Sequence, residues 1–338
     1  MDEIILEVKH MTVTIYENGE AYNVVNRISF NVGKGEIVGI VGESGCGKSM
    51  TALALQDLLK NHIKVTEGSM MFDGRDLLKV SAAERRQING NDMTMIFQEP
   101  MTSLNPLYRI GPQVGEVLLL HGHHSHAEIE EKTIEALRMA GLPDPVKTMR
   151  MYPHELSGGM RQRVMIAMGI IAQPKLLIAD EPTTALDVTT QAHVLELLKS
   201  INEKTGTAIL LISHDLGVIN KICSRVLVMY AGKIVEQGKV NDIFYNPLHP
   251  YTKGLLASMP RLDEDSHERL IPIEGTPIDL LNPPKGCNFA PRCKDCRKIC
   301  LRQKPPFADY GDGHTSACWL HFMEDDGASA SGEEAIGK

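Results

Sequence analysis

EIVGIVGESGCGKSM, residues 36–50, joins an apolar run to a glycine-rich loop, and the apolar pattern TALALQDLL (51–59) follows it. The run predicts a buried strand, and the pattern after the loop predicts a helix. Glycines allow backbone N–H groups to turn inward on phosphate oxygens, and the start of a helix adds partial positive charge. The order of strand, G-x-x-x-x-G-K-S loop and helix therefore predicts a phosphate-binding loop. Its residues are Gly42, Glu43, Ser44, Gly45, Cys46, Gly47, Lys48, Ser49 and Met50.

Three side chains of this loop have separate expected properties. Lys48 is expected to neutralise the β- and γ-phosphates of a nucleotide, and Ser49 is expected to ligate Mg²⁺. Cys46 has two interpretations. A thiol at the start of a helix can have a lowered pKa and high reactivity, or it can be a small side chain tolerated at a variable position of the motif.

Polar side chains also occur at the carboxyl ends of three further predicted strands. They are Asp180 and Glu181 after Leu176 to Ala179, His214 after Thr207 to Ser213, and Gln98 at the end of 93–98. This arrangement predicts an open α/β sheet that binds its ligand at the edge where the strands end. Asp180 is expected to hold Mg²⁺ through water, and Glu181 to act as general base or polariser for the attacking water. His214 is expected to contact the γ-phosphate, and Gln98 to reach Mg²⁺ or the water.

The stretch HELSGGMRQRVMIAMGII (154–171) predicts a second helix with an anion site at its start. Ser157 is a predicted N-cap, and the N–H groups at Gly158 and Gly159 are left free for an anion. One chain thus contains two helix starts that can bind a phosphate, but only one phosphate loop. We expect the two helix starts to serve different nucleotides across a dimer.

Together and in this order, GESGCGKS, Gln98, LSGGM, LLIADE, the ALD of 185–187 and His214 resemble the ATP-binding cassette (ABC) ATPases, over about residues 4 to 245. The LSGGM element excludes most other phosphate-loop enzymes. The resemblance implies a RecA-like core, a helical insertion at about 100–170, ATP with Mg²⁺, and a head-to-tail dimer. In that dimer Ser157 to Gly159 of one subunit close over the ATP of the other.

The resemblance also extends to an aromatic residue, and it fails at one position of the phosphate loop. It implies that Tyr16 stacks on the adenine, with Tyr22 as a nearby alternative. Met50 departs from the family, in which a threonine often follows the serine. Because Ser49 is retained, we expect Mg²⁺ binding to be unaffected.

The stretches FQEPMTSLNP (97–106) and NPLHPYTKGLL (246–256) resemble the ATPase subunits of dipeptide and oligopeptide importers, a group that includes nickel importers. This implies ATP hydrolysis coupled to import through separate transmembrane permease subunits, with the cargo chosen by the permease and an extracytoplasmic binding protein. The second ATPase of the dimer is then a copy of this chain or a paralogue. The expected organisation is an ATPase domain over 1–245, a small cysteine-rich extension over 246–323, and a disordered acidic tail over 324–338.

Charge and hydropathy restrict the location and the class of protein. The 338 residues have a formal charge of −8, which argues against a nucleic-acid partner. The acidic start does not resemble a signal peptide, and the longest apolar runs are of strand length. We therefore expect a peripheral protein on the cytoplasmic side of the membrane. Two other classes stay open: a soluble ABC protein of DNA repair or translation, and a module that binds ATP without turnover.

Five of the seven cysteines lie between residues 287 and 318, and in a reducing cytosol such a cluster more often binds metal than forms disulfides. The spacing of Cys287, Cys293, Cys300 and Cys318 matches that of peptide-importer ATPases, and this resemblance implies a structural [4Fe–4S] cluster. Zinc can use the same ligands, and disulfides or free thiols stay open. Cys296 departs from the family pattern, because it forms with Cys293 a C-x₂-C pair that is more typical of zinc.

The tract HGHHSH (121–126) is the remaining candidate for metal binding. It lies between two helical patterns, and a compositional tract is weak evidence for a metal site. We therefore expect a connecting loop there.

Overall fold

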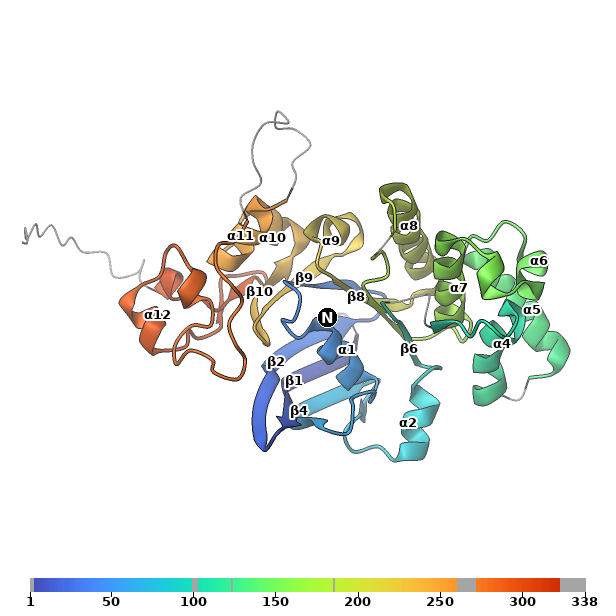
Figure 1. Ribbon diagram of the computed structural model, residues 1–338, viewed down its shortest axis with the longest axis horizontal. Coiled ribbons are helices and arrows are strands. Elements are labelled where there is room, and N and C mark those ends of the chain that lie inside the picture. The colour runs from blue at the N-terminus through green and yellow to red at the C-terminus, as the bar shows by residue number, and fades with distance from the viewer. Residues whose placement is uncertain (1–2, 99–102, 123, 185, 260–271, 323–338) are drawn as a thin grey trace, which may run out of the picture.

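The computed structural model describes residues 3–98, 103–122, 124–184, 186–259 and 272–322, and a mixed sheet of eight strands runs through its middle (Figure 1). The strands from β9 to β6 are parallel, and the other three are antiparallel. Every residue of β3, β7 and β8 is buried, as expected for parallel strands covered on both faces. In spatial order the strands are β11 (Ala308–Asp309), β12 (Thr315–Ser316), β10 (Lys233–Lys239), β9 (Arg225–Tyr230), β3 (Ile37–Val41), β8 (Ala208–Ser213), β7 (Leu176–Asp180) and β6 (Met93–Ile96).

A second sheet is antiparallel and covers one face of the first. Its order is β2 (Glu20–Gly33), β1 (Ile4–Glu17), β4 (Ile63–Phe72) and β5 (Arg75–Asp76). Side chains alternate across β3, so Val38 and Ile40 join the core under this sheet, whereas Ile37 and Val41 join the core on the opposite face. The helix α1 (Lys48–Leu55) contributes to the core under the second sheet, and α2 (Ala82–Ile88) lies beside it.

Helices form the other face and one end of the molecule. The expected helical insertion corresponds to α4 (Ile110–His121), α5 (His126–Met139), α6 (Pro145–Arg150), the 3₁₀ turn η1 (Pro153–Glu155) and α7 (Gly158–Ile170). Figure 1 shows these helices at the end of the molecule opposite to the C-terminal extension. Further along the described part of the ATPase region lie α8 (Val188–Thr205), α9 (Leu216–Ile222) and α10 (Val240–Tyr245). The predicted α/β class is confirmed.

The C-terminal extension is continuous with the main sheet. It contains α11 (Pro250–Ala257), the 3₁₀ turn η2 (Ala290–Arg292), α12 (Lys298–Arg302) and the turn η3 (Trp319–Phe322), together with β11 and β12. β12 pairs with β10, with Ser316 opposite Glu236 and Thr315 opposite Gln237. The expected tail over 324–338 lies outside the described residues, as do positions 99–102 of the FQEPMTSLNP stretch.

An aromatic cluster joins the extension to the ATPase region. The ring of Tyr230, at the end of β9, lies 4.7 Å from that of Tyr251 and 5.2 Å from that of Phe289, between ring centres. Tyr230 and Tyr251 are fully buried. No helix within the described part of the chain is both long enough and apolar enough to span a membrane.

Candidate nucleotide-binding and hydrolysis site

The predicted phosphate loop connects β3 to α1 and packs closely against its neighbours. At Gly42 the backbone angle φ is +154°, and a Cβ atom there would lie 2.1 Å from the carbonyl oxygen of Met229. At Gly47, where φ is +107°, a Cβ atom would lie 2.8 Å from the carbonyl oxygen of Val24. Side chains rarely adopt these angles, so glycine is required at both positions.

Lys48 is buried and donates hydrogen bonds within its own loop. Its Nζ lies 2.7 Å from the carbonyl oxygen of Gly42 and 3.0 Å from that of Glu43. Burial raises the pKa of the Cys46 thiol, in spite of the nearby Lys48. A raised pKa favours the interpretation of Cys46 as a small buried side chain over that of a reactive thiol. Met50 packs against the core under the second sheet, and Ser44 and Gly45 are exposed.

Ser49 and Asp180 meet at the carboxyl end of β7. The Ser49 hydroxyl donates to Oδ1 of Asp180 at 3.1 Å. Burial raises the pKa of Asp180, and the hydrogen bond from Ser49 and the charge of Lys48 oppose that rise only in part. A buried carboxylate beside a hydroxyl supplies the hard oxygen ligands that Mg²⁺ prefers. The residues present therefore fit a magnesium ion.

Glu181 is the centre of the polar contacts at this edge. Its Oε2 accepts hydrogen bonds from Nε2 of Gln98 at 2.9 Å and from the Thr184 hydroxyl at 2.8 Å. Nδ1 of His214 lies 3.3 Å from Oε1. The structure thus brings together the three side chains that were predicted from separate strands, and it adds Thr184, which sequence reasoning missed.

The surroundings of Glu181 keep its carboxylate charged. Burial alone would raise the pKa of Glu181, but the hydrogen bonds from Thr184 and His214 outweigh burial and lower it. The backbone of Glu181 has a φ of +47°, which is uncommon for a residue other than glycine. Such conformations often occur at functional sites, where the surrounding structure enforces them.

The second predicted anion site is at the start of α7. Ser157 is the N-cap, and its hydroxyl accepts the backbone N–H of Met160 at 3.3 Å. A Cβ atom at Gly158 would meet nothing within 4 Å of the same chain. Among the described residues, no neighbour requires glycine at position 158. At Gly159 a Cβ atom would lie 3.0 Å from the side chain of Thr190.

The two candidate tyrosines lie on opposite faces of the hairpin formed by β1 and β2. Tyr22 is paired with Ile15 and packs against the core, whereas Tyr16 is the neighbour of Ile15 in β1 and is 47% exposed. Because successive side chains of a strand point to opposite faces, Tyr16 is the one available to a ligand.

The five cysteines of the extension lie close enough to interact electrostatically with one another. Burial raises the pKa of Cys293 to about 12 and that of Cys318 to about 11, and in both cases Cys287 adds to the rise. Cys300 contributes to the raised pKa of Cys296 and of Cys287, and its carbonyl accepts the Cys287 backbone N–H at 2.7 Å. Among the described residues no three His, Cys, Asp or Glu side chains are placed to hold one metal ion.

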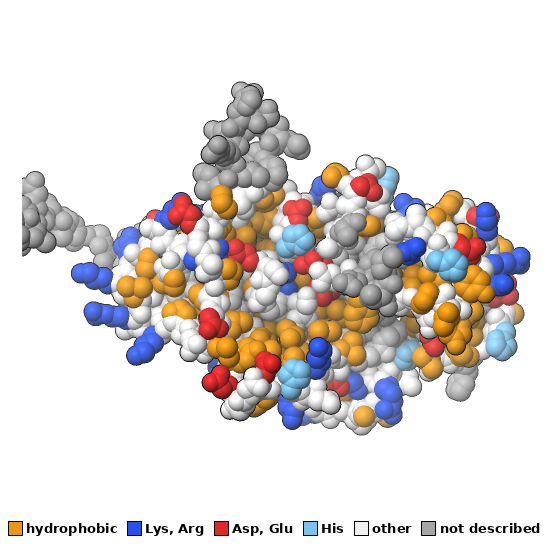
Figure 2. All heavy atoms as spheres, in the orientation of Figure 1, with side chains coloured by type: hydrophobic (Ala, Val, Ile, Leu, Met, Phe, Trp, Pro, Cys, Tyr) orange, Lys and Arg blue, Asp and Glu red, His pale blue; other side chains and the backbone are white. Residues whose placement is uncertain are grey.

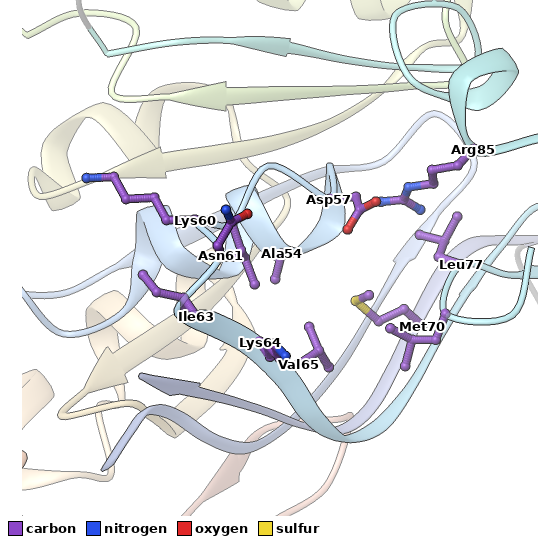
Figure 3. Close-up of a pocket in the computed structure, with 12 residues that line it drawn as sticks. Ala54, Asp57, Lys60, Asn61, Ile63, Lys64, Val65, Met70, Leu77 and Arg85 are labelled. Atoms are coloured by element: carbon purple, nitrogen blue, oxygen red, sulfur yellow. The ribbon is translucent and has the colours of Figure 1, made fainter. Parts of the chain in front are cut away.

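Two other regions, the histidine-rich tract 121–126 and a surface pocket, do not include the predicted residues of the nucleotide site. The described residues of the tract 121–126 end α4 and begin α5, as expected of a connection. A pocket with a volume of about 380 Å³ lies between α1, β4 and α2 (Figure 3). There Asp57 and Arg85 point toward one another, and Arg85 donates to the Leu55 carbonyl at the end of α1, so this arginine caps a helix.

The sheet, the phosphate loop and the residues around Glu181 define a phosphate-loop nucleotide-binding protein. A family model described as "ABC transporter" matches residues 25–184, and one described as "Oligopeptide/dipeptide transporter, C-terminal region" matches residues 235–300. The chain belongs to the family of ABC transporter ATP-binding proteins, and it carries the ATPase domain of that family.

Two relatives and one solved structure illustrate the similarity. The dipeptide transport ATP-binding protein DppD of Bacillus subtilis is 48% identical over 98% of this chain and 99% of its own length. The oligopeptide transport ATP-binding protein OppD of Salmonella typhimurium is 48% identical over 95% of each chain. A dimeric ATP-binding cassette in a post-hydrolysis state with ADP and Pi matches with a TM-score of 0.63 and 29% identity, covering 70% of this chain and 98% of its own.

Proposed function

We propose that this chain is the ATP-hydrolysing subunit of an importer for dipeptides or oligopeptides. The observation that carries the proposal is the similarity to peptide-transport ATP-binding proteins along nearly the whole chain, extension included. The ATPase domain occupies residues 1–245, and the extension occupies 246–323. The chain works as a peripheral subunit on the cytoplasmic side of the membrane.

ATP binding uses the phosphate loop and Tyr16. Lys48 exchanges its bonds to the carbonyls of Gly42 and Glu43 for bonds to the β- and γ-phosphates, so its charge is already at the loop when ATP arrives. Magnesium, when bound, neutralises phosphate charge, and Ser49, Gln98 and Asp180 are the residues that would hold it. The exposed ring of Tyr16 stacks on the adenine.

Hydrolysis uses the side chains gathered at Glu181. Its carboxylate accepts a proton from the attacking water, and its lowered pKa keeps it ready for this at neutral pH. His214, 59% exposed, contacts the γ-phosphate side of the site, and Gln98 is the third polar contact. Thr184 holds the carboxylate in place through its hydroxyl.

The active form is a head-to-tail dimer with a copy of this chain or with a paralogous ATPase. The start of α7 contributes Ser157, Gly158 and Gly159 to the nucleotide of the partner. The open space at Gly158 supports this role, because a Cβ atom there would meet none of the described residues of its own chain within 4 Å. A γ-phosphate that approaches from the partner supplies the reason for glycine.

The partners at the membrane are transmembrane permease subunits, and an extracytoplasmic binding protein acts indirectly through them. Apolar side chains lie exposed over the helical insertion (Figure 2), among them Leu107, Tyr108, Leu119 and Leu120, which are 81%, 60%, 61% and 69% exposed. Exposed apolar surface of this kind is common where a protein binds a partner.

The extension holds a structural [4Fe–4S] cluster on Cys287, Cys293, Cys300 and Cys318. Four thiols in one small region, two of them buried, supply the donor set of such a cluster. A zinc ion needs four sulfurs at about 2.3 Å from one point, whereas a cubane keeps its four ligands further apart. Zinc is the alternative occupant.

Transport by the assembled complex tests the proposal. The chain is co-expressed with its permease and partner ATPase, and the complex is placed in liposomes with the binding protein inside and labelled dipeptide, tripeptide or nickel also inside. The lumen then corresponds to the outside of the cell, and the ATPase faces the surrounding buffer. Added ATP should drive peptide from the lumen into this buffer, which is the direction of import. Lys48→Ala should abolish this movement. Movement of nickel but of no peptide would overturn the assignment, and so would ATP hydrolysis that moves neither.

A further inference from the structure

The cysteine-rich extension contacts the phosphate loop at Glu43, and Arg292 makes the ionic part of that contact. Arg292 is the last residue of η2 and lies between Cys287 and Cys293 in the sequence. Its two terminal nitrogens donate to the two carboxylate oxygens of Glu43, at 2.6 and 2.9 Å. The Arg292 side chain is 3% exposed, and that of Glu43 is 27% exposed. Paired bonds of this kind fix both the distance and the direction of a carboxylate.

Arg292 is itself fixed by the extension. Its Nε donates to the carbonyl of Glu274 at 3.1 Å, and a terminal nitrogen also donates to the carbonyl of Ile273 at 3.2 Å. The guanidinium carbon lies 5.8 Å from the centre of the Tyr230 ring, within the range of cation–π attraction. Every nitrogen of the guanidinium therefore has a partner. These bonds hold the guanidinium in place, so a movement of the phosphate loop would break its bonds to Glu43.

The backbone of Glu43 is also bonded, at both its N–H and its carbonyl. Its N–H donates to the hydroxyl of Tyr251, in α11, at 2.9 Å, and Tyr251 is fully buried. Its carbonyl accepts the ammonium of Lys48 at 3.0 Å. The N–H, the carbonyl and the side chain of Glu43 thus all have partners, and the partners of the N–H and of the side chain belong to the extension.

The ion pair of Arg292 and Glu43 is not explained well by a contribution to the stability of the fold. A buried ion pair often contributes no more than an apolar pair of the same size, because both charges lose water. A bidentate pair does, however, select one geometry. The loop beyond Glu43 contains Gly45 and Gly47, which allow many backbone conformations. A fixed point at Glu43 restricts the loop to the conformation that presents its N–H groups and Lys48.

We propose that Arg292 is a positioning residue for ATP binding, which acts through Glu43 and makes the cysteine-rich extension a part of the nucleotide site. The structure of the segment 287–293 then determines the affinity of the phosphate loop for ATP. The proposal rests on Arg292, Tyr251 and Glu43 and holds whether the thiols bind a cluster, zinc or nothing. Its failure would leave the proposed transport function and the proposed cluster unaffected.

A double-mutant cycle on the full-length chain tests the proposal. The Kd for MgATP is measured by calorimetry well below the unfolding temperature for Arg292→Gln, Glu43→Gln and the double variant. Each single change should weaken ATP binding about 5- to 20-fold, at the lower end of the range that is typical of coupled sites. The double variant should be no weaker than either single variant, because both remove the same contact. Unchanged affinity, or effects that add, would overturn the proposal.

Matched variants separate positioning from general stability. His314→Gln removes another buried contact of the extension, the hydrogen bond between Nε2 of His314 and Glu236 at 2.8 Å, and should lower Tm without changing the Kd for ATP. Lys294→Gln removes an exposed pair with Glu274 and should change neither. If Arg292→Gln does not fold, Arg292→Lys and Tyr251→Phe replace it, and each should raise the KM for ATP with kcat nearly unchanged. Variants that lower Tm as His314→Gln does and leave KM unchanged would assign Arg292 a structural role only.

Discussion

At the scale of single residues, Glu181 has a charged carboxylate because of what surrounds it. Three polar neighbours from three different segments contact its two oxygens. Burial acts to raise the pKa of Glu181, but the hydrogen bonds from two of these neighbours, Thr184 and His214, help to lower it. A base for water must be deprotonated at the pH at which the enzyme works, and it must lie at a fixed distance from the water. The neighbours meet both requirements. Replacing Glu181 should therefore remove the base, whereas replacing a neighbour should only change the pKa of the base.

Glu181→Gln should retain ATP binding and nearly stop turnover. The amide fits the same space and cannot accept the proton of the attacking water, and loss of a general base typically costs about 10²- to 10⁴-fold in rate. ATP should then remain bound and keep the dimer closed, which size-exclusion chromatography with MgATP can detect. Hydrolysis at the parental rate would exclude Glu181 as the base.

Thr184→Val should change the pH dependence of turnover. The hydroxyl that donates to Glu181 helps to lower its pKa, so its removal should raise that pKa. Activity would then fall at a higher pH on acidification than in the parent chain. Thr184→Ser retains the hydroxyl and is the matched control. Identical acid limbs for the valine and serine variants would show that Thr184 does not tune the base.

At the scale of elements, the start of α11 depends on a neutral histidine. His249 is the N-cap of this helix, and its Nδ1 accepts the backbone N–H of Tyr251 at 3.0 Å. Burial lowers the pKa of His249 to about 3. The folded state therefore keeps His249 uncharged at pH values at which the unfolded chain would protonate it.

The folded chain should lose stability as the pH falls below about 6.5, the pKa of a free histidine. The unfolded chain binds the proton first, so the contribution of His249 is complete above this pH and declines toward the folded pKa. At pH 5 the loss should be about 2 kcal/mol. Denaturant unfolding at pH 7 and pH 5 measures it. His249→Asn retains a capping acceptor and should show a smaller difference between the two pH values; an equal difference would contradict the assignment.

The cysteine-rich part of the extension has few strands and helices of its own. Bound metal would therefore stabilise a segment with little core. Protein purified without oxygen should be brown, with a broad absorption near about 400 nm and roughly four irons per chain. Cys287→Ser or Cys318→Ser should remove the colour, whereas Cys296→Ser should not. Colourless protein with one zinc per chain, and with Cys296 required, would establish zinc instead.

At the scale of the whole molecule, the proposed dimer places half of each active site on another chain. Ser157→Arg should leave ATP binding to the monomer intact, because Ser157 serves the nucleotide of the partner. Dimer formation and hydrolysis should decrease together, since a large side chain would enter a close phosphate contact. Calorimetry and size-exclusion chromatography measure the two properties. Loss of monomer affinity equal to that of Lys48→Ala would place Ser157 in its own site.

The main sheet and its edge could be predicted from the sequence because buried parallel strands are continuous apolar runs. In β3, β7 and β8 such runs lead directly to the side chains of the site. The contact between Arg292 and Glu43 could not be predicted, because it joins positions 249 residues apart and leaves no periodic pattern. β11 and β12, with two residues each, are likewise too short to produce an alternation. Thr184 lies in a loop, where no period identifies a functional hydroxyl.

The pairing of β12 with β10 also bears on how the protein is made. During synthesis the residues of β10 leave the ribosome well before those of β12 and β11, which complete that side of the sheet. Until then β10 presents free N–H and C=O groups, and an unpaired strand edge is a template for association with other chains. We expect chains that stop before residue 308 to self-associate more readily than full-length chains. The last part of the polypeptide thus protects newly made molecules from each other.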